Sequence, residues 1–281
     1  MPRLSLDKIV SEVNDLPALP HVTYQVIKLV DDPESTAEDI NNVVIQDQSL
    51  TARVLRLANS AHYGFPRRIS TVTEATVLLG FNTIKGIVMA ASVNEMMVKE
   101  ITGYALAPGE LWRHSQAAAI ASRYIARQVK FPQPDVAYIG GLLHDIGKVV
   151  LNHHVKGVYH EVVELTNTGL PFLDAEREIL GFTHPEVGSR VAEKWNLPKD
   201  LVQAIAHHHA PQDAVGNEKI TSIVHIADAM CLMMGIGIGM DGLSYNISEA
   251  ALQVLGQSLG NADQIISNLV DVLSDQNSFL G

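Results

Sequence analysis

Helical periodicity runs through nearly the whole chain, and it limits the possible folds more than any other feature of the sequence. Apolar residues recur three and four positions apart, and the breaks between such segments are short and rich in proline or glycine. No alternating run long enough for a β-strand competes with this pattern. The sequence therefore predicts an all-α fold, a compact bundle of many helices. We expect its later helices over about 82–98, 108–129, 134–153, 158–166, 171–180, 183–195 and 198–209.

Three segments have the pattern of a capping box, in which a Ser or Thr and a later Glu close the first turn of a helix. They are Ser35-Thr36-Ala37-Glu38, Thr71-Val72-Thr73-Glu74 and Thr183-His184-Pro185-Glu186. The third also has a proline just inside the helix, a position that proline favours. We therefore expect His184 to be held at a rigid helix start.

The charge and the single cysteine exclude several classes of protein. A net charge of −11 repels phosphate backbones, so general nucleic-acid binding is not expected. Cys231 lies among apolar residues, which predicts core packing in a reducing cytoplasm. The most apolar region, 220–240, is interrupted by His225 and Asp228, so we expect a buried helix there and no membrane contact. The chain is thus expected to be cytoplasmic.

The segment Leu142–Lys148 combines an imidazole, a carboxylate and an ammonium within an apolar stretch. Burying these three groups without partners would be costly, and a metal ion or an anionic ligand would remove that cost. A helix end where His144 bonds Asp145 and Lys148 reaches water explains the segment equally well when it is considered alone.

Further imidazoles and carboxylates lie on the neighbouring helices. Glu110 and His114 are four residues apart and share a helix face, His184 stands at a helix start, and Asp228 lies on an apolar helix. Simple alternatives exist, because His184 could be a cap-region residue, the histidines at 207–209 could form a solvated helix end, and Asp228 could bond a neighbouring backbone group. Together with the triplet His207–His209, they form a donor set that suits Fe, Mn, Zn or Ni better than Ca or Mg. His225, one turn before Asp228, is expected to be packed rather than ligating.

The order of His114, His144-Asp145, His208-His209 and Asp228 resembles the HD superfamily of metal-dependent phosphohydrolases. Three earlier segments narrow the resemblance to the HDOD family, the HD-related output domain of bacterial signalling proteins. They are Leu16–Pro20, Asp47–Ser60 and Ala75–Gly80. The resemblance covers roughly residues 11 to 235. It implies an N-terminal helical lobe over 1–103, an HD-like metal-binding lobe over 104–240 and a C-terminal helical tail over 241–281.

Similarity to the related HD-GYP phosphodiesterases implies the individual ligands. The positions that match their metal ligands are Glu110, His114, His144, Asp145, His184, His208, His209 and Asp228. In that comparison Asp145 bridges two ions, with Fe or Mn favoured over Zn or Ni, and Lys148 matches the lysine that binds substrate phosphate. The Gly-Tyr-Pro element after the paired histidines is absent, because Ala210–Gly216 stands there. Hydrolysis of cyclic di-GMP is therefore not inferred.

Two main functions follow from the resemblance, and a third, an oxygen-using di-iron enzyme, is less favoured because it is the chemistry of only some HD relatives. The first is a regulatory output module whose metal centre stabilises the fold or senses a ligand, with signalling proteins or a small phosphorylated ligand as partners. The second is a phosphohydrolase for a nucleotide, a cyclic dinucleotide or another phosphoester, in which Asp145 and Lys148 are the catalytic residues. An open cleft at Lys148 and His184 would favour hydrolysis, and a sealed site would favour regulation. The oligomeric state does not follow from the sequence.

Overall fold

The structure is a computed structural model of the chain, and it describes residues 19–60, 63–239, 247–256 and 262–274. Within these residues it is all-helical, as predicted, with no β-strand and an isolated antiparallel bridge between Ile101 and Leu106. The chain divides into two compact units. We call residues 17–95 with 271–281 the N-terminal unit, and residues 1–16 with 96–270 the central unit.

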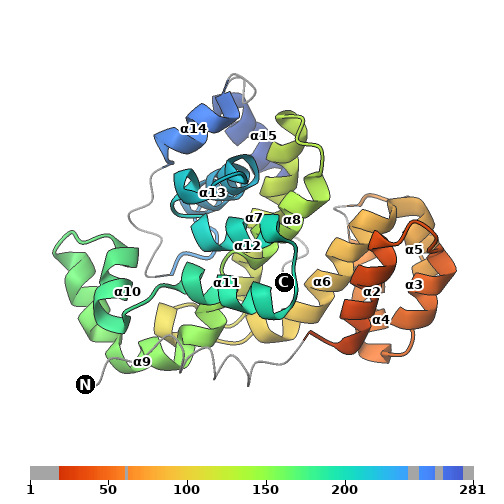
Figure 1. Cartoon of the computed structure of the whole chain (residues 1–281), viewed down its shortest axis with the longest axis horizontal. Coiled ribbons are helices and arrows are strands. Elements are labelled where there is room, and N and C mark those ends of the chain that lie inside the picture. The colour runs from red at the N-terminus through yellow and green to blue at the C-terminus, as the bar shows by residue number, and fades with distance from the viewer. Residues whose placement is uncertain (1–18, 61–62, 240–246, 257–261, 275–281) are drawn as a thin grey trace. The chain divides into compact units, whose positions relative to one another are not determined.

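Helices α2 to α6 lie in the N-terminal part of the chain (Figure 1), and the last residues of α6 belong to the central unit. These helices are α2 His21–Asp31, α3 Ala37–Val44, α4 Gln48–Ala58, α5 Val72–Leu79 and α6 Phe81–Met97. Ile40, Leu50, Val54 and Ile84 are fully buried in one cluster at the centre of the N-terminal unit. The same cluster contains Val26 of α2 and Val72 of α5, so each of the five helices contributes apolar residues to this core.

The central unit carries the segments singled out for their chemistry. Its elements are η2 Thr102–Tyr104, α7 Glu110–Gln128, α8 Pro134–Leu143, α9 Ile146–Asn167, α10 Phe172–Leu180, α11 His184–Lys194, α12 Lys199–His207, η3 Pro211–Asp213, α13 Glu218–Met233 and α14 Glu249–Leu255, followed by α15 Ala262–Ser274. Helix α7 packs against α8 and α13, α11 packs against α9 and α12, and α14 packs against α13. Part of the predicted tail, 240–246, 257–261 and 275–281, lies outside the described residues.

Two glycines bring the helices of the central unit unusually close together. A Cβ added to Gly141 would lie 2.6 Å from the carbonyl oxygen of Ala118, where α8 meets α7. A Cβ added to Gly147 would lie 1.9 Å from the carbonyl oxygen of His184, where α9 meets α11. Only glycine leaves room for these backbone contacts, and both lie next to the His144-Asp145 pair in sequence.

One predicted helix is wrong in an informative way. The sequence predicted a single helix over 134–153, but α8 ends at Leu143 and α9 begins at Ile146. Asp145 has φ −97° and ψ 9° and stands at the N-terminus of α9. The chain therefore turns at His144 and Asp145. The predicted helix over 158–166 is in fact the second part of α9, which bends at Val158, where φ is −124°.

Two of the three predicted capping boxes are found, one of them with a shift in register. The third is incomplete, because the Thr71 hydroxyl accepts from the Glu74 backbone N–H at 3.0 Å but the Glu74 carboxylate accepts from the Ser70 backbone N–H instead. Thr183 and Glu186 form the expected box, since the Glu186 carboxylate accepts from the Thr183 backbone N–H at 2.8 Å. The first box is formed by Thr36 and Asp39 instead of Ser35 and Glu38, because the same pattern also fits one residue later. None of the described helices is long and apolar enough to cross a membrane.

Candidate metal centre

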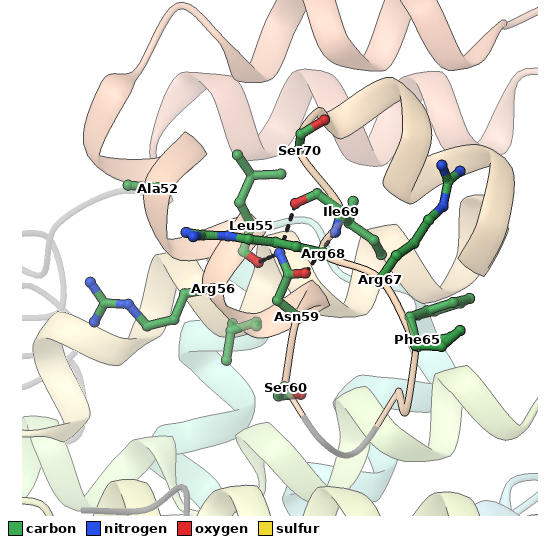
Figure 2. Close-up of a pocket in the computed structure, with 12 residues that line it drawn as sticks. Ala52, Leu55, Arg56, Asn59, Ser60, Phe65, Arg67, Arg68, Ile69 and Ser70 are labelled. Carbon is green, nitrogen blue, oxygen red and sulfur yellow. Dashed lines mark hydrogen bonds between the residues drawn. The ribbon is translucent and has the colours of Figure 1, made fainter.

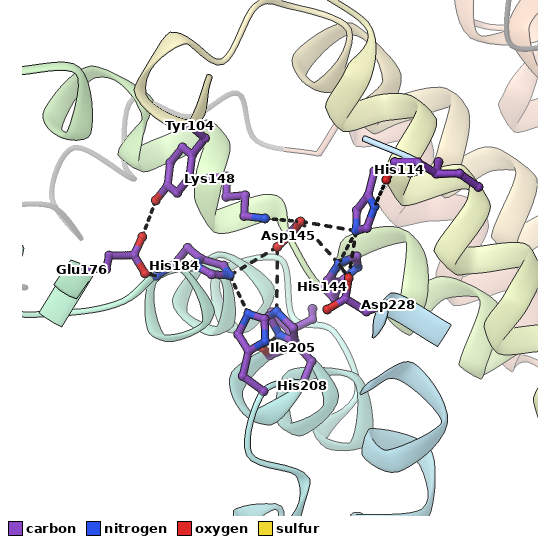
Figure 3. A network of polar contacts seen from close by, with 12 residues as sticks. Tyr104, His114, His144, Asp145, Lys148, Glu176, His184, Ile205, His208 and Asp228 are labelled. Atoms are coloured by element: carbon purple, nitrogen blue, oxygen red, sulfur yellow. Dashed lines mark hydrogen bonds and ion pairs between the residues drawn. The ribbon is translucent and has the colours of Figure 1, made fainter. Parts of the chain in front are cut away.

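Six of the predicted site residues meet inside the central unit (Figure 3). Each comes from a different place in the chain: His114 from the second turn of α7, the His144-Asp145 pair from the turn between α8 and α9, His184 from the start of α11, His208 from the end of α12, and Asp228 from α13. Among these side chains, none is more than 3% exposed. A seventh, His209, is adjacent and partly exposed.

The first group of donors surrounds Asp228. The His114 Nε2 atom lies 3.0 Å from Asp228 Oδ1, and the His144 Nε2 atom lies 3.5 Å from the same oxygen. The two Nε2 atoms are 3.3 Å apart. The Asp145 Oδ2 atom completes the group, at 3.4 Å from His144 Nε2 and 3.8 Å from His114 Nε2. Two imidazoles and two carboxylates thus point at one small volume.

The second group lies on the other side of Asp145. The His184 Nε2 atom is 3.3 Å from Asp145 Oδ1, and the His208 Nε2 atom is 3.8 Å from the same oxygen. The Nε2 atoms of His184 and His209 are 3.0 Å apart. The ligand atoms of His184, His208 and His209 all lie within 4.8 Å of one another. Asp145 therefore directs one carboxylate oxygen to each group of histidines.

The backbone and one carboxylate fix which ring nitrogen faces the site. The Nδ1 atom of His114 lies 3.0 Å from the Ile236 carbonyl oxygen, that of His144 lies 2.7 Å from the Gly141 carbonyl oxygen, and that of His208 lies 2.8 Å from the Ile205 carbonyl oxygen. A carbonyl oxygen only accepts, so each Nδ1 is a donor. In the neutral ring the Nε2 lone pair is then directed into the site, as in metal-binding histidines.

Glu176 is a further residue of the candidate site, and the sequence did not predict it. Its buried carboxylate on α10 accepts from the backbone N–H of His184 at 2.8 Å, from His184 Nδ1 at 2.9 Å, and from the Tyr104 hydroxyl. It thus orients His184 as the carbonyls orient the other histidines. A signal was available, because Glu176 shares the apolar face of its helix with Phe172, Ala175 and Ile179.

Protons on His144 and His184 offset the negative charge of the neighbouring carboxylates. Burial alone would lower the pKa of His144, but the carboxylates of Asp145 and Asp228 raise that pKa to about 10. Burial likewise opposes the charge of His184, yet Glu176 and Asp145 raise its pKa to about 9. His208 has its pKa lowered well below the usual range by burial and by His144 and His184.

The two carboxylates keep their charge in spite of burial. Burial favours the neutral form of Asp145, but Lys148 and His144 hold its pKa well below the usual range. Burial also favours the neutral form of Asp228, but His144 and His114 hold the pKa of Asp228 well below the usual range. The site therefore holds two anionic carboxylates, which are the charged ligands a divalent cation needs.

The donor set fits a metal centre. The Asp145 Oδ1 and His208 Nε2 atoms are buried and make no hydrogen bond, an arrangement that is costly unless another group completes it. Two pairs of Nε2 atoms also face each other, those of His184 and His209 at 3.0 Å and those of His114 and His144 at 3.3 Å. Mixed imidazole and carboxylate donors suit first-row transition metals.

Lys148 is buried within the site. Its side chain is 5% exposed, its Nζ donates to Asp145 Oδ2 at 2.6 Å, and it lies 5.8 Å from the centre of the Tyr104 ring. The side chains of Lys148 and His184 are both almost fully buried, so neither is exposed to bulk solvent.

Three other residues lie outside these donor groups. Glu110 is one turn before His114, but its side chain is 34% exposed and accepts from Arg113 at 2.9 Å, so its role as a ligand stays a prediction. His207 is partly exposed and belongs to none of the groups of donors found among the described residues. His225 is packed, as expected: its Nδ1 donates to the His208 carbonyl oxygen and its Nε2 accepts from the Ser248 backbone N–H.

With this geometry established, comparison with known proteins assigns the family. The family model of the HDOD domain matches residues 16–211, more than half of the chain. The chain belongs to the HDOD family. Among proteins of known sequence, an uncharacterised protein of Treponema pallidum is 25% identical to this HDOD protein over 72% of the chain. The chain spans about two fifths of the length of that relative, namely 39%.

Solved structures share the fold. An HDOD domain protein of unknown function from Geobacter sulfurreducens is 26% identical, covers 99% of both chains and has a TM-score of 0.78. A protein of Shewanella amazonensis, named as a candidate phosphohydrolase, has a TM-score of 0.67 at 23% identity, and the match covers 93% of this chain and 97% of that one. The second likeness concerns the fold alone.

Proposed function

We propose that this HDOD protein is a regulatory module with two divalent transition-metal ions, bridged by Asp145, in its central unit. The position of the Asp145 carboxylate carries the proposal, because its two oxygens face two different groups of histidines. His114, His144 and Asp228, whose donor atoms lie within 3.5 Å of one another, would hold one ion. His184, His208 and His209 would hold the other. Iron or manganese is favoured, and zinc or nickel also suits this donor set.

The burial of the site supports regulation over turnover. A substrate phosphate must reach both the ions and Lys148, but Lys148 and His184 are almost fully buried and Lys148 already bonds Asp145. Ions held in a closed site stabilise the fold by mass action and need no open coordination position. The module would act on signalling proteins or respond to a small phosphorylated ligand.

Metal analysis of the purified protein tests the proposal. We expect about two transition-metal equivalents per chain after purification without chelators or metal-affinity columns. Asp145→Ala should lose most of this metal, whereas Asp174→Ala, which removes an exposed carboxylate from α10, should keep it. Metal-free protein with a native circular dichroism spectrum and no uptake of added Fe²⁺ or Mn²⁺ would contradict the proposal.

Phosphoester hydrolysis is the second candidate function, and Lys148 is the observation that favours it. Its ammonium group lies beside the Asp145 carboxylate, where it could offset charge that develops on a phosphoryl group. A divalent ion supplies Lewis acidity and lowers the pKa of bound water. The residues of the chain would then position the phosphoester and exclude bulk water.

Turnover assays separate the two functions. The regulatory proposal expects metal-loaded protein to hydrolyse bis-p-nitrophenyl phosphate and cyclic dinucleotides no faster than Asp145→Ala does. Metal-dependent turnover that falls at least tenfold in Lys148→Gln, but not in the exposed control Lys194→Gln, would establish hydrolysis instead.

A further inference from the structure

A second site of different chemistry lies in the N-terminal unit. Residues 48–73 contain four arginines and no carboxylate, although the chain as a whole has a net charge of −11. The arginines are Arg53 and Arg56 on α4, and Arg67 and Arg68 in the segment that leads to α5. Such a local excess of positive charge attracts anions in an otherwise repulsive field.

Two of these arginines are neutralised and two are not. Arg53 bonds Glu95 and Ser49, and Arg67 pairs with Glu74 at 3.0 Å. Arg56 and Arg68 are exposed, and no ion pair or hydrogen bond joins either side chain to another of the described residues. Their guanidinium groups are therefore available to an external anion.

Arg56 and Arg68 line the same pocket, which has a volume of about 1080 Å³. Figure 2 shows both side chains reaching toward the side of the pocket where Ala52 lies. Guanidinium groups bind phosphate oxygens in a bidentate manner, and two of them can share one phosphate or hold two neighbouring ones.

The pocket is built on a fixed frame. The Asn59 amide nitrogen donates to the carbonyl oxygens of Leu55 at 2.7 Å and of Ile69 at 2.9 Å, and the Asn59 amide oxygen accepts from the Ile69 backbone N–H at 2.8 Å. These bonds join α4 to the segment that carries Arg68. The backbone positions that carry the two arginines thus keep their spacing without a ligand, which lowers the entropic cost of binding.

The pocket also has an apolar wall. Leu55 and Phe65 line it, are partly buried and pack against the core of the N-terminal unit. A volume of this order suits a small molecule, and an apolar wall with a few charged groups is the usual composition of such sites. A free phosphate ion would use the arginines but leave this wall uncovered.

We propose that this pocket binds a phosphorylated small molecule of nucleotide size, with its phosphate on Arg56 and Arg68 and its apolar part on Leu55 and Phe65. The net negative charge of the whole protein argues against a nucleic-acid polymer, whose other phosphates would meet a repulsive surface. The site is separate from the metal donors and does not depend on the proposed function of that centre.

Fluorescence anisotropy with N-methylanthraniloyl derivatives of ATP and GTP tests the proposal on the full chain. We expect saturable binding that is at least tenfold weaker in Arg56→Gln/Arg68→Gln, since each guanidinium–phosphate contact contributes a charge-assisted hydrogen bond. The control Lys28→Gln/Arg190→Gln removes the same charge from exposed positions outside the pocket and should change the affinity by less than twofold. Thermal unfolding checks that both variants remain folded.

Competition then separates the possible ligand classes. Unlabelled nucleotide should displace the probe better than pyrophosphate or the free nucleoside, because only the nucleotide uses both parts of the pocket. The proposal is overturned if neither probe binds, if the double arginine variant binds as well as the wild type, if pyrophosphate competes as well as the nucleotide, or if only RNA or an acidic phosphopeptide binds.

Discussion

At the scale of single residues, the candidate metal centre depends on which atom each side chain presents. Three ring nitrogens are held by backbone carbonyl oxygens, but His184 depends on the carboxylate of Glu176. A carboxylate both fixes the tautomer and raises the basicity of the ring, which a carbonyl does more weakly. Glu176 is therefore the most informative position outside the donors themselves.

Replacing Glu176 by Gln should weaken metal binding about 10- to 100-fold, a typical result of losing such a partner. The amide keeps the volume of the side chain but loses the charge that raises the pKa of His184. Glu178→Gln, at an exposed position on the same helix, is the matched control and should bind metal normally. Competition with a chromophoric chelator gives the affinities, and equal affinities for the two variants would exclude an orienting role for Glu176.

Metal affinity should rise with pH between about 6 and 9, because protons and metal compete for the same nitrogens. Without metal, His144 and His184 have pKa values raised to about 10 and about 9, so both are protonated at neutral pH. Both must become neutral to ligate, and lowering the pH therefore opposes binding. Calorimetric titration in two buffers of different ionisation enthalpy measures the protons released; a heat that is independent of the buffer would contradict this account.

At the scale of secondary structure elements, the close contact between α9 and α11 brings Asp145 and His184 together. Gly147→Ala should destabilise the protein by about 1–3 kcal/mol, as overpacking of a tight contact does. The added Cβ would lie 1.9 Å from the His184 carbonyl oxygen, so α11 must shift. Gly157→Ala, on the same helix with no atom within 4 Å of its added Cβ, should be neutral or slightly stabilising. Thermal unfolding of both variants measures the difference, and equal melting temperatures would show that the helices can separate at no cost.

The sequence predicted the existence of the helices better than the residues at which they begin and end. Periodicity and proline or glycine breaks identified most helices, but His144 and Asp145 themselves are neither proline nor glycine and stand in a continuous apolar stretch, so the two helices were merged. The turn is determined by tertiary packing around the centre, which local pattern does not encode. Glu176 was missed for a similar reason, since its role depends on a contact with His184 from another helix.

At the scale of the whole molecule, the two compact units differ in chemistry. The central unit contains the clustered imidazoles and carboxylates, and the N-terminal unit contains the arginine-lined pocket. Bound metal should therefore stabilise the central unit directly. At a free metal concentration a hundred times the Kd, binding to a single site stabilises the native state by about 2.7 kcal/mol.

Removing metal with a chelator should increase hydrogen exchange in peptides from α11, α12 and α13, which carry His184, His208 and Asp228. Peptides from α2, α3 and α5 should exchange at unchanged rates, because none of the proposed ligands lies on these helices. Mass spectrometry of the exchanged full chain measures both sets, and Asp145→Ala without chelator should reproduce the pattern. Equal acceleration in both units would mean that metal stabilises the protein as one cooperative body, and no change in either would exclude the metal centre as a source of stability.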